Sequence, residues 1–499
     1  MATQDSVRPR LASEVKSWDA EADVVITGYG GAGAGAAIEA ARAGADVLVL
    51  ERAGGPGGAS GMSGGYVYTG GGTALQKACG VTDTPENFYN GLLASTGPTA
   101  GPTPQTHRER CEVYAAEGVA YFDWLVSFGI PYKERFFDGP TWQAPADYGL
   151  TWSGGENAYP WNEIAAPAPR AHIAYLPPEQ YKGDAGPGQV VLKHLVAGAD
   201  ALGVKKELDV RVERLVTETD GRVVGVIGRR YGREFAVRAR RGVVLTAGGF
   251  MNNPEMLSQF SPPAHGAGLV GTEGDDGRGI KMGQAVGGDV QLMDRAEVAV
   301  SLDAPLLWNS IVVNTAGDRF VNEDTYGGRV GQHILFRQDA RAVCVFDEEI
   351  WQGYQGVEGA LMPMQLSWVC ETIEELEKEA GIPAGALRLT VDYYNTHAAH
   401  GEDPKFHKRA AYLRPLKPPF AAIAVSKEHN SFSCFTIGGL RANAKGEVLH
   451  VDGSPIPGLY AGGRTASGIP AWGYLSGSSL GDSIFFGRKA GASAAAFTG

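Results

Sequence analysis

The chain has 499 residues, 43% of them hydrophobic, and this is longer than a single hydrophobic core usually supports, so we expect two domains. Its 44 Lys and Arg residues against 56 Asp and Glu residues give a net charge of −12, which argues against nucleic acid or an anionic membrane as the main partner. No secretory signal precedes the first predicted strand and no apolar run approaches the ~20 residues of a membrane span, so we expect a cytoplasmic enzyme without a stable membrane anchor.

The first predicted unit is a strand, a glycine loop, a helix and a second strand. The apolar strand 23–27 leads into the loop 28–33 (GYGGAG), a small-residue helix spans 34–44, and the strand 46–50 ends at Glu51. Glycines at such a turn bring backbone N–H groups to a pyrophosphate, and an acid about 20 residues after the loop can accept from a ribose hydroxyl. This pattern predicts a site for FAD or NAD that contains Gly28, Gly30, Gly31, Ala32, Gly33, Glu51 and Arg52.

The following stretch, residues 53–65, contains almost no bulky side chain. A segment of this kind fits a loop pressed against a flat, extended cofactor, because glycine lets the backbone approach a ligand closely. The alternative interpretation is a flexible linker. If the segment does lie along the cofactor, the candidate contacts are Gly58, Ala59, Ser60, Met62, Ser63, Gly64 and Gly65.

The middle of the chain holds predicted scaffold elements and one segment that has two interpretations. Residues 141–180 are rich in Trp, Tyr and Pro, and they fit equally well the wall of a cavity for an apolar ligand or a proline-rich surface segment packed on itself. Residues 205–237 alternate apolar and polar side chains around the turn 219–221, which predicts a β-hairpin or meander. A domain boundary is expected just after the pair Gly287-Gly288, and an amphipathic helix near 371–380.

Neither a disulfide framework nor a metal site is expected. The five cysteines are scattered without a CxxC pair, which predicts ordinary buried thiols. Histidines at 333, 397, 400 and 407 do not have the spacing of a metal cluster, so we expect surface or structural roles for them.

A glycine- and serine-rich loop near the end of the chain, residues 471–481, leads into an apolar helix. The loop carries Tyr474 and Ser476, and the helix start carries Ser479 and Leu480. The first N–H groups of a helix have no partner within it and the helix dipole points outward there, so such an end attracts anions and electron-rich groups. We therefore expect this loop to close the cofactor site and to select the substrate.

Four separated motifs resemble the fumarate reductase/succinate dehydrogenase flavoprotein family. They are the Gly/Ser segment above, Thr246-Ala247-Gly248-Gly249, the segment 274–279 (GDDGRG) and the segment 458–463 (GLYAGG). The resemblance implies an α/β fold in which a Rossmann-like FAD-binding domain (residues 1–288 and 431–499) carries an inserted α+β cap, or catalytic, domain (residues 289–430). It adds Ala247, Gly248, Gly249, Asp276, Gly463, Ser479 and Leu480 to the expected FAD contacts.

The resemblance also bears on how the flavin is held and on what lies above it. Family members with covalent flavin carry a His in the first Gly/Ser segment, whereas residues 54–68 contain none, so FAD is expected to bind non-covalently. The segment 317–326 resembles the family's GxRFxNE segment, which brings cap residues over the flavin.

The catalytic positions differ from those of fumarate reductases, which carry one Arg shortly after the NE pair and a second in the C-terminal loop. The corresponding positions here are Tyr326 and Tyr474. A dicarboxylate without guanidinium partners in a site of low dielectric loses several kcal/mol, so these positions argue against dicarboxylate chemistry and fit a largely hydrocarbon ketone better. Tyr326, Tyr474 and Ser476 together resemble the 3-ketosteroid Δ4-(5α)-dehydrogenases.

This second resemblance implies removal of the C4 proton and the C5 hydride of a 5α-3-ketosteroid, which gives a 4-ene-3-ketosteroid. We assign Tyr474 and a backbone N–H of the 477–478 region to the carbonyl oxygen, where negative charge develops, and Ser476 with Tyr326 to the proton. The three side chains can exchange these roles, and no residue identifies the electron acceptor. Alternatives are a 3-ketosteroid Δ1-dehydrogenase, another flavin ketone or enoate oxidoreductase, or a non-catalytic flavin electron-carrier subunit.

Overall fold

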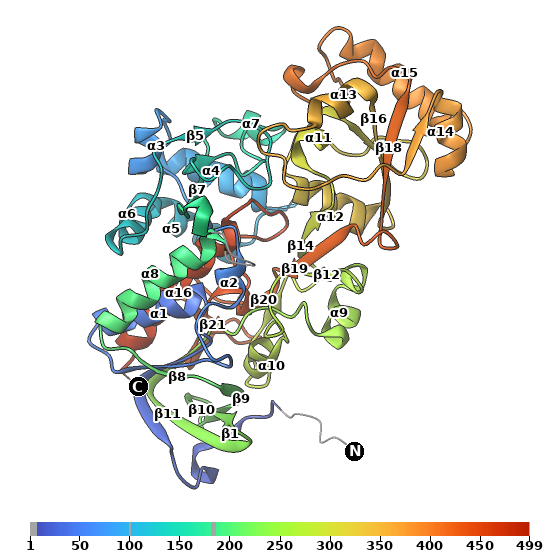
Figure 1. Cartoon of the computed structure of the whole chain (residues 1–499). Helices are drawn as coiled ribbons and strands as arrows, with labels where there is room; N and C mark the ends of the chain where they lie inside the picture. Colours follow the sequence, from blue (N-terminus) through green and yellow to red (C-terminus); the bar gives the residue numbers. More distant parts are fainter. Residues whose placement is uncertain (1–6, 99–100, 181–185, 499) are drawn as a thin grey trace.

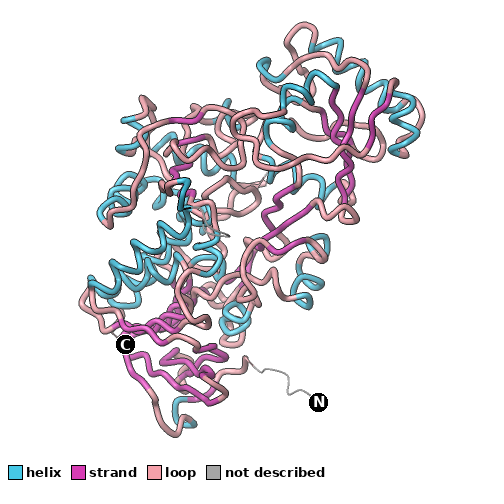
Figure 2. Tube along the Cα trace, viewed as in Figure 1, coloured by secondary structure: helices cyan, strands magenta, loops and turns pink. Residues whose placement is uncertain are grey.

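The computed structural model describes residues 7–98, 101–180 and 186–498. Figure 1 shows a lower part, in which a large sheet lies beside α1, α8 and α16, and a separate upper part that contains α13, α14 and α15. Strands β14 and β19 run between the two parts, as the tube in Figure 2 also shows. The α/β class and the Rossmann-like unit with a cap are therefore confirmed.

The large mixed sheet has the order β1-β9-β10-β11-β2-β3-β8, and β22 continues it from β11. Strands β2, β3, β8 and the second half of β11 run parallel, as expected for a dinucleotide-binding unit. The strands are β1 Arg10–Leu11, β2 Ala20–Thr27, β3 Val47–Leu50, β8 Lys205–Glu207, β9 Val210–Thr217, β10 Val223–Arg230, β11 Arg233–Leu245, β21 Glu447–Leu449 and β22 Pro455–Ala461.

Two helices pack closely against each other beside this sheet. Helix α1 (Gly31–Arg42) begins three residues earlier than predicted, because the last glycines of the loop already form its first turn with Gly30 as N-cap. Helix α16 (Ser478–Ala496) brings the C-terminal loop back to the first glycine loop.

The predicted hairpin is confirmed, since β9 and β10 pair antiparallel around residues 218–222.

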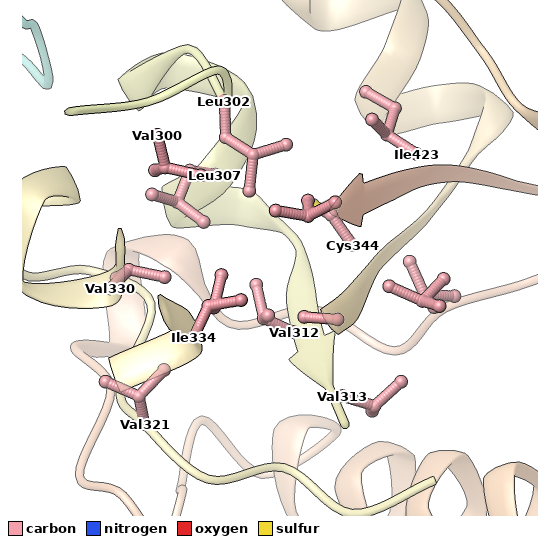
Figure 3. Close-up of a cluster of buried hydrophobic side chains, with 14 of the residues drawn as sticks. Val300, Leu302, Leu307, Val312, Val313, Val321, Val330, Ile334, Cys344 and Ile423 are labelled. Atoms are coloured by element: carbon pink, nitrogen blue, oxygen red, sulfur yellow. The ribbon is translucent and has the colours of Figure 1, made fainter. Parts of the chain in front are cut away.

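The upper part is built on a sheet of order β15-β16-β18-β17 with antiparallel pairings. The predicted amphipathic helix is confirmed as α14, which starts where the Thr372 hydroxyl accepts from Glu375 N. Figure 3 shows the core, where Val330 and Ile334 lie near Val312. The elements are α11 Ala304–Asn309, β15 Ile311–Val313, α12 Gly327–Arg337, β16 Arg341–Asp347, α13 Glu348–Tyr354, β17 Trp368–Cys370, α14 Ile373–Ala380, α15 Ala386–Ala398 and β18 Phe420–Ser426.

Short strands connect the two parts near the predicted boundaries. Strand β19 pairs antiparallel with β14 and parallel with β12, and β13 pairs with β20. The division into 1–288 with 431–499 and 289–430 stays a prediction. The bounds are α9 Pro254–Phe260, β12 Gly268–Leu269, α10 Arg278–Gln284, β13 Val290–Gln291, β14 Ala296–Val300, β19 Phe432–Thr436 and β20 Gly439–Leu440.

A third group of elements comes from residues 58–201. Its sheet has the order β4-β7-β6-β5. Its elements are α2 Gly58–Met62, β4 Tyr66–Tyr68, α3 Ala74–Ala78, α4 Pro85–Thr96, α5 Gln105–Ala116, α6 Gly118–Ser127, β5 Phe136–Phe137, β6 Leu150–Thr151, α7 Trp161–Ile164, β7 Ala171–Ile173 and α8 Pro187–Ala201.

The cysteines are free thiols; four are buried and Cys79 is half-buried. Within residues 7–98, 101–180 and 186–498, no three His, Cys, Asp or Glu side chains group in a way that could hold a metal ion. A search of the same residues finds no helix with both the length and the apolar character needed to cross a bilayer.

Candidate active site

A cavity of about 980 Å³ begins at the carboxyl ends of β2, β3 and β11 and ends at the C-terminal loop. Its first wall is the glycine loop, where a side chain at Gly28 would place a Cβ 2.5 Å from Thr246 O. Glu51 lies at the end of β3, and its carboxylate accepts from Tyr29 N (2.6 Å) and Ala53 N (2.8 Å). An elongated cavity with a helix N-terminus and an acid at one end fits a dinucleotide.

Most of the residues predicted to contact the cofactor line this cavity. They are Gly28, Gly30, Gly31, Ala32, Glu51, Arg52, Gly58, Ala59, Ser60, Met62, Ser63, Gly64, Ala247, Gly248, Asp276, Gly463, Ser479 and Leu480. The three remaining glycines, Gly33, Gly65 and Gly249, lie behind the wall and pack on other parts of the chain. A Cβ at Gly33 would lie 2.0 Å from Gly28 O, and one at Gly65 would lie 2.5 Å from the Pro187 carbonyl carbon. Gly249 N donates to Asp275 Oδ1 at 2.9 Å.

Two aspartates hold the wall segment 269–279 in place. Asp276 accepts from Arg52 at 3.1 Å and from Arg211 at 3.3 Å. Both carboxylate oxygens of the buried Asp275 accept from Arg464 Nη2 at 2.9 Å. Asp275 is therefore a buried counter-ion for Arg464. The Arg464 guanidinium also lies 5.2 Å from the centre of the Phe435 ring on the same wall.

The far end of the cavity is lined by Tyr66, Phe435, Tyr474 and Ser476. The loop that carries Tyr474 is fixed by local contacts: Tyr68 N donates to Gly477 O at 3.1 Å, and Ser478 N donates to Leu475 O at 2.9 Å. Gly477 has φ +86°, and a Cβ there would lie 2.9 Å from Tyr66 Cβ. A backbone N–H of the 477–478 region was expected to meet the carbonyl oxygen, but the N–H of Ser478 is engaged within the loop by Leu475 O.

The Tyr474 side chain is a buried phenol. Its ring lies 5.4 Å from that of Phe435 and 5.8 Å from that of Tyr326, measured between centres. Burial raises the pKa of Tyr474 above its ordinary value, and the nearby Glu297 carboxylate adds to the rise. The phenol consequently stays protonated and can donate a hydrogen bond.

Tyr326 lies at the start of α12, behind Tyr474 rather than on the cavity wall. Its hydroxyl donates to Glu297 Oε1 at 2.8 Å, and its ring is 5.3 Å from that of Trp142. Burial, followed by the negative charge of Glu297, raises the pKa of Tyr326 far above its ordinary value. The structure therefore brings Tyr326 and Tyr474 together, with Ser476 two residues further along the loop.

A buried ion network explains the GxRFxNE segment that precedes Tyr326. Arg319 binds Glu323 at 2.7 Å and Asp403 at 2.9 Å, and Lys408 binds Glu323 at 3.2 Å. Glu323 also accepts from Val312 N at 3.0 Å, which attaches the segment to β15. The charged residues of this motif thus have a structural function: they fix the segment that ends at Tyr326.

The sequence did not indicate two charged residues near the phenols, the buried Glu297 on β14 and the half-buried Arg329 on α12. Burial raises the pKa of Glu297 to about 8, and burial lowers the pKa of Arg329 to about 10. Arg329 donates to Ser95 O at 2.8 Å and lies 4.1 Å from the centre of the Trp161 ring. An isolated acid in the apolar strand 296–300 is the only sequence signal for Glu297, and it does not indicate the neighbouring phenol.

The aromatic segment 141–180 contributes to the surroundings of the site. Trp142 packs on Tyr326 and donates to Leu302 O at 2.9 Å, and Trp161 packs under Arg329. Trp152, in contrast, donates to Asp138 on the exposed side. The segment therefore combines both interpretations: two of its Trp residues enclose the site, and another is half-buried and bonded to the exposed Asp138.

Comparisons with known proteins agree on one family. A family model described as FAD binding domain matches residues 23–480. A crystal structure of 3-ketosteroid-Δ4-(5α)-dehydrogenase from Rhodococcus jostii RHA1, in complex with 4-androstene-3,17-dione, is 49% identical, with a TM-score of 0.93 over 98% of this chain and 100% of that chain.

Two curated proteins are more distant relatives. The 3-oxo-5-alpha-steroid 4-dehydrogenase of Comamonas testosteroni is 28% identical over 91% of this chain and 94% of its own length. A probable fumarate reductase of Shewanella frigidimarina is 26% identical over 99% of this chain and 77% of its own length.

Proposed function

Because the chain belongs to the FAD binding domain family and binds FAD, we propose that it is a flavin-dependent dehydrogenase that converts a 5α-3-ketosteroid into the 4-ene-3-ketosteroid. The observation that carries the proposal is a pair of phenols: Tyr474, which lines the far end of the cofactor cavity, and Tyr326, whose ring packs behind it. The similar Rhodococcus jostii enzyme was crystallised with a steroid of this class.

The residues that line the cavity fit FAD. The N–H group of Gly30, just before α1, would face the pyrophosphate, whereas Gly31 N donates to Ser60 Oγ at 3.1 Å. Glu51 would accept from a ribose hydroxyl. The segment 58–64 would lie along the flavin, and in the absence of a His between residues 54 and 68 the bond to the protein would be non-covalent. When bound, FAD supplies the hydride acceptor for the reaction.

The charges around the substrate end favour a neutral ketone over a dicarboxylate. Arg464 on the wall is paired with both oxygens of Asp275, and Arg329 lies behind the phenols, bound to Ser95 O and stacked on Trp161. A dicarboxylate would have to break these contacts to find a guanidinium partner. A ketone needs only a donor at its oxygen, and Tyr474 supplies one.

The proposed chemistry assigns a task to each residue. Tyr474 donates to the C3 carbonyl oxygen, which acidifies the C4 hydrogens because the developing enolate oxygen is stabilised. Ser476 and Tyr326 take the C4 proton, and the C5 hydrogen leaves as hydride on the opposite face of the substrate. A separate electron acceptor then completes the turnover.

We place the protein in the cytoplasm, because its free thiols suit a reducing compartment.

Anaerobic reduction by two steroids tests the proposal. We expect 5α-androstane-3,17-dione to bleach the flavin absorbance and 4-androstene-3,17-dione to leave it unchanged. Bleaching by the second steroid would instead indicate a Δ1-dehydrogenase, and bleaching by neither would indicate an electron carrier. Return of the oxidised flavin colour when fumarate is added to the reduced protein would indicate dicarboxylate chemistry, which the pairing of Arg464 argues against.

A further inference from the structure

A buried carboxylate, that of Glu297, lies behind the two phenols and accepts from the Tyr326 hydroxyl. We propose that Glu297 is the positioning residue that receives the substrate's proton through the Tyr326 hydroxyl, and this inference depends on the proposed steroid dehydrogenation. It extends the proton path by one residue beyond the group that meets the substrate.

The geometry places Glu297 at the end of a short path. Its side chain is 3% exposed, and Oε1 accepts from the Tyr326 hydroxyl at 2.8 Å. Backbone pairing of Glu297 with Phe435 in β19 fixes it behind the cavity wall. A Cβ at Gly328 would lie 2.1 Å from Oε1, so the absence of a side chain there makes room for the carboxylate at the start of α12.

The second oxygen of the Glu297 carboxylate distinguishes this group from a carboxylate that has only a structural role. Oε2 of Glu297 is buried and accepts no hydrogen bond from any described residue. Glu323, which is equally buried in the same part of the molecule, receives Arg319, Lys408 and Val312 N. A buried carboxylate that serves only structure is normally fully paired, because an unpaired buried oxygen is costly. Glu297 therefore retains a place for a proton.

The groups that face Glu297 come from three elements. From α12 come Tyr326 and Arg329, with His333 one turn beyond Arg329; from β19 comes Cys434; from the C-terminal loop comes Tyr474. Burial raises the pKa of Glu297 to about 8, although the Tyr326 hydroxyl, Val298 N and the Arg329 charge each oppose the rise. The carboxyl group thus changes its protonation state near neutral pH, whereas the phenols stay protonated.

The proton transfer needs no reactant other than the substrate and these side chains. The C4–H bond breaks and its electron pair remains on the substrate as the enolate. The Ser476 hydroxyl, which lines the cavity, receives the C4 proton and passes its own hydrogen to the Tyr326 oxygen, while the Tyr326 hydrogen moves to the Glu297 carboxylate. One proton has then moved from carbon to Glu297, which becomes a neutral carboxylic acid, and the same hydroxyl returns it to water after the product leaves.

The pH dependence of anaerobic flavin reduction tests this inference with Glu297→Gln, which keeps the size of the side chain and an oxygen for Tyr326. In the unaltered protein the rate should rise about tenfold per pH unit below pH 8 and level off above it, since only the carboxylate accepts a proton. In Glu297→Gln the rise through pH 8 should disappear, and the rate at pH 9 should fall by about 10²-fold.

Controls separate a proton path from a structural role. Glu377→Gln replaces a buried glutamate that accepts from Gly385 N and Arg388 N on the far side of the upper part, and it should leave rate and pH profile unchanged. Because Glu297 acts through Tyr326, Glu297→Gln should add no further loss in a Tyr326→Phe background. An additive loss, or an unchanged profile in Glu297→Gln, would overturn the inference.

A measurement on the unaltered protein covers the case in which the variant does not fold. Infrared difference spectra recorded on anaerobic mixing of the unaltered protein with 5α-androstane-3,17-dione at pH 9 should show a new carboxylic acid C=O band. Absence of the band in a protein whose flavin is bleached would overturn the inference alone. If the flavin is not bleached by this steroid at all, the proposed function has failed instead.

Discussion

At the scale of single residues, the hydroxyl of Tyr474 lies where burial removes competition from water. A donor in such a place stabilises a developing oxyanion strongly, because it is already oriented and the local dielectric is low. Tyr66 and Phe435 surround it with largely apolar surface, so a hydrocarbon skeleton can occupy the same space. One oxygen atom thus carries the electrostatic part of the proposed reaction.

Replacing Tyr474 with Phe tests this assignment. The variant should retain yellow FAD that is released on acid denaturation, and should lose about 10²- to 10³-fold in the rate of flavin reduction by 5α-androstane-3,17-dione. Tyr393→Phe, on the exposed face of α15, is the matched control and should keep the full rate. Unchanged reduction by Tyr474→Phe would remove Tyr474 from the reaction, and a flavin that stays with the denatured protein would contradict non-covalent binding.

The residues of the site differ in how far the sequence could predict them. Tyr326, Tyr474 and Ser476 stand in recognisable motifs, so their positions could be predicted, although their roles stay predictions. Glu297 and Arg329 could not be found in this way, because they become neighbours only when β14 packs against α12. A lone acid in a short strand has no pattern until β14 and α12 are brought together.

At the scale of secondary-structure elements, α1 and α16 approach each other through glycines. A Cβ at Gly487 would lie 2.2 Å from Ala32 O, and one at Gly491 would lie 2.1 Å from Ala36 O. This close approach holds the start of α16, and with it the Tyr474 loop, against the dinucleotide loop. The small residues after the glycine loop therefore serve helix packing as well as cofactor binding.

Gly487→Ala should destabilise the protein by about 1–3 kcal/mol, because the added methyl group collides with a backbone carbonyl rather than a flexible side chain. Chemical denaturation of the FAD-loaded protein measures the effect. Gly353→Ala is the control: that glycine lies in α13 with open space around its Cα, and the change should be neutral or stabilising by up to about 1 kcal/mol. Equal stability of the two variants would contradict the tight α1–α16 contact.

Element boundaries followed local chemistry to different degrees. The β2–α1–β3 unit, the β9–β10 hairpin and α14 were predictable, because alternation, glycine turns and capping residues act within a few residues. The early start of α1 was not, since loop glycines that join a helix have no distinct signal. The pairing of β14 with β19 was equally inaccessible, because it joins segments more than 130 residues apart.

At the scale of the whole molecule, the candidate site draws on segments that are distant in the sequence. Tyr474 comes from the C-terminal loop, Tyr326 and Glu297 come from elements joined to the upper part, and the cofactor wall comes from the first glycine loop. The fold class and the cofactor could be predicted because their motifs recur in chain order. Which side chains meet at the centre depends on how β14, β19 and α12 pack, and this follows from the whole fold.

Turnover of deuterium-labelled 5α-androstane-3,17-dione with an artificial electron acceptor tests the central claim most directly. The account predicts 4-androstene-3,17-dione that has lost the label from C5 and one label from C4, and has retained every label at C1 and C2. A product unsaturated between C1 and C2, or recovery of the labelled steroid unchanged by a protein loaded with FAD, would contradict it.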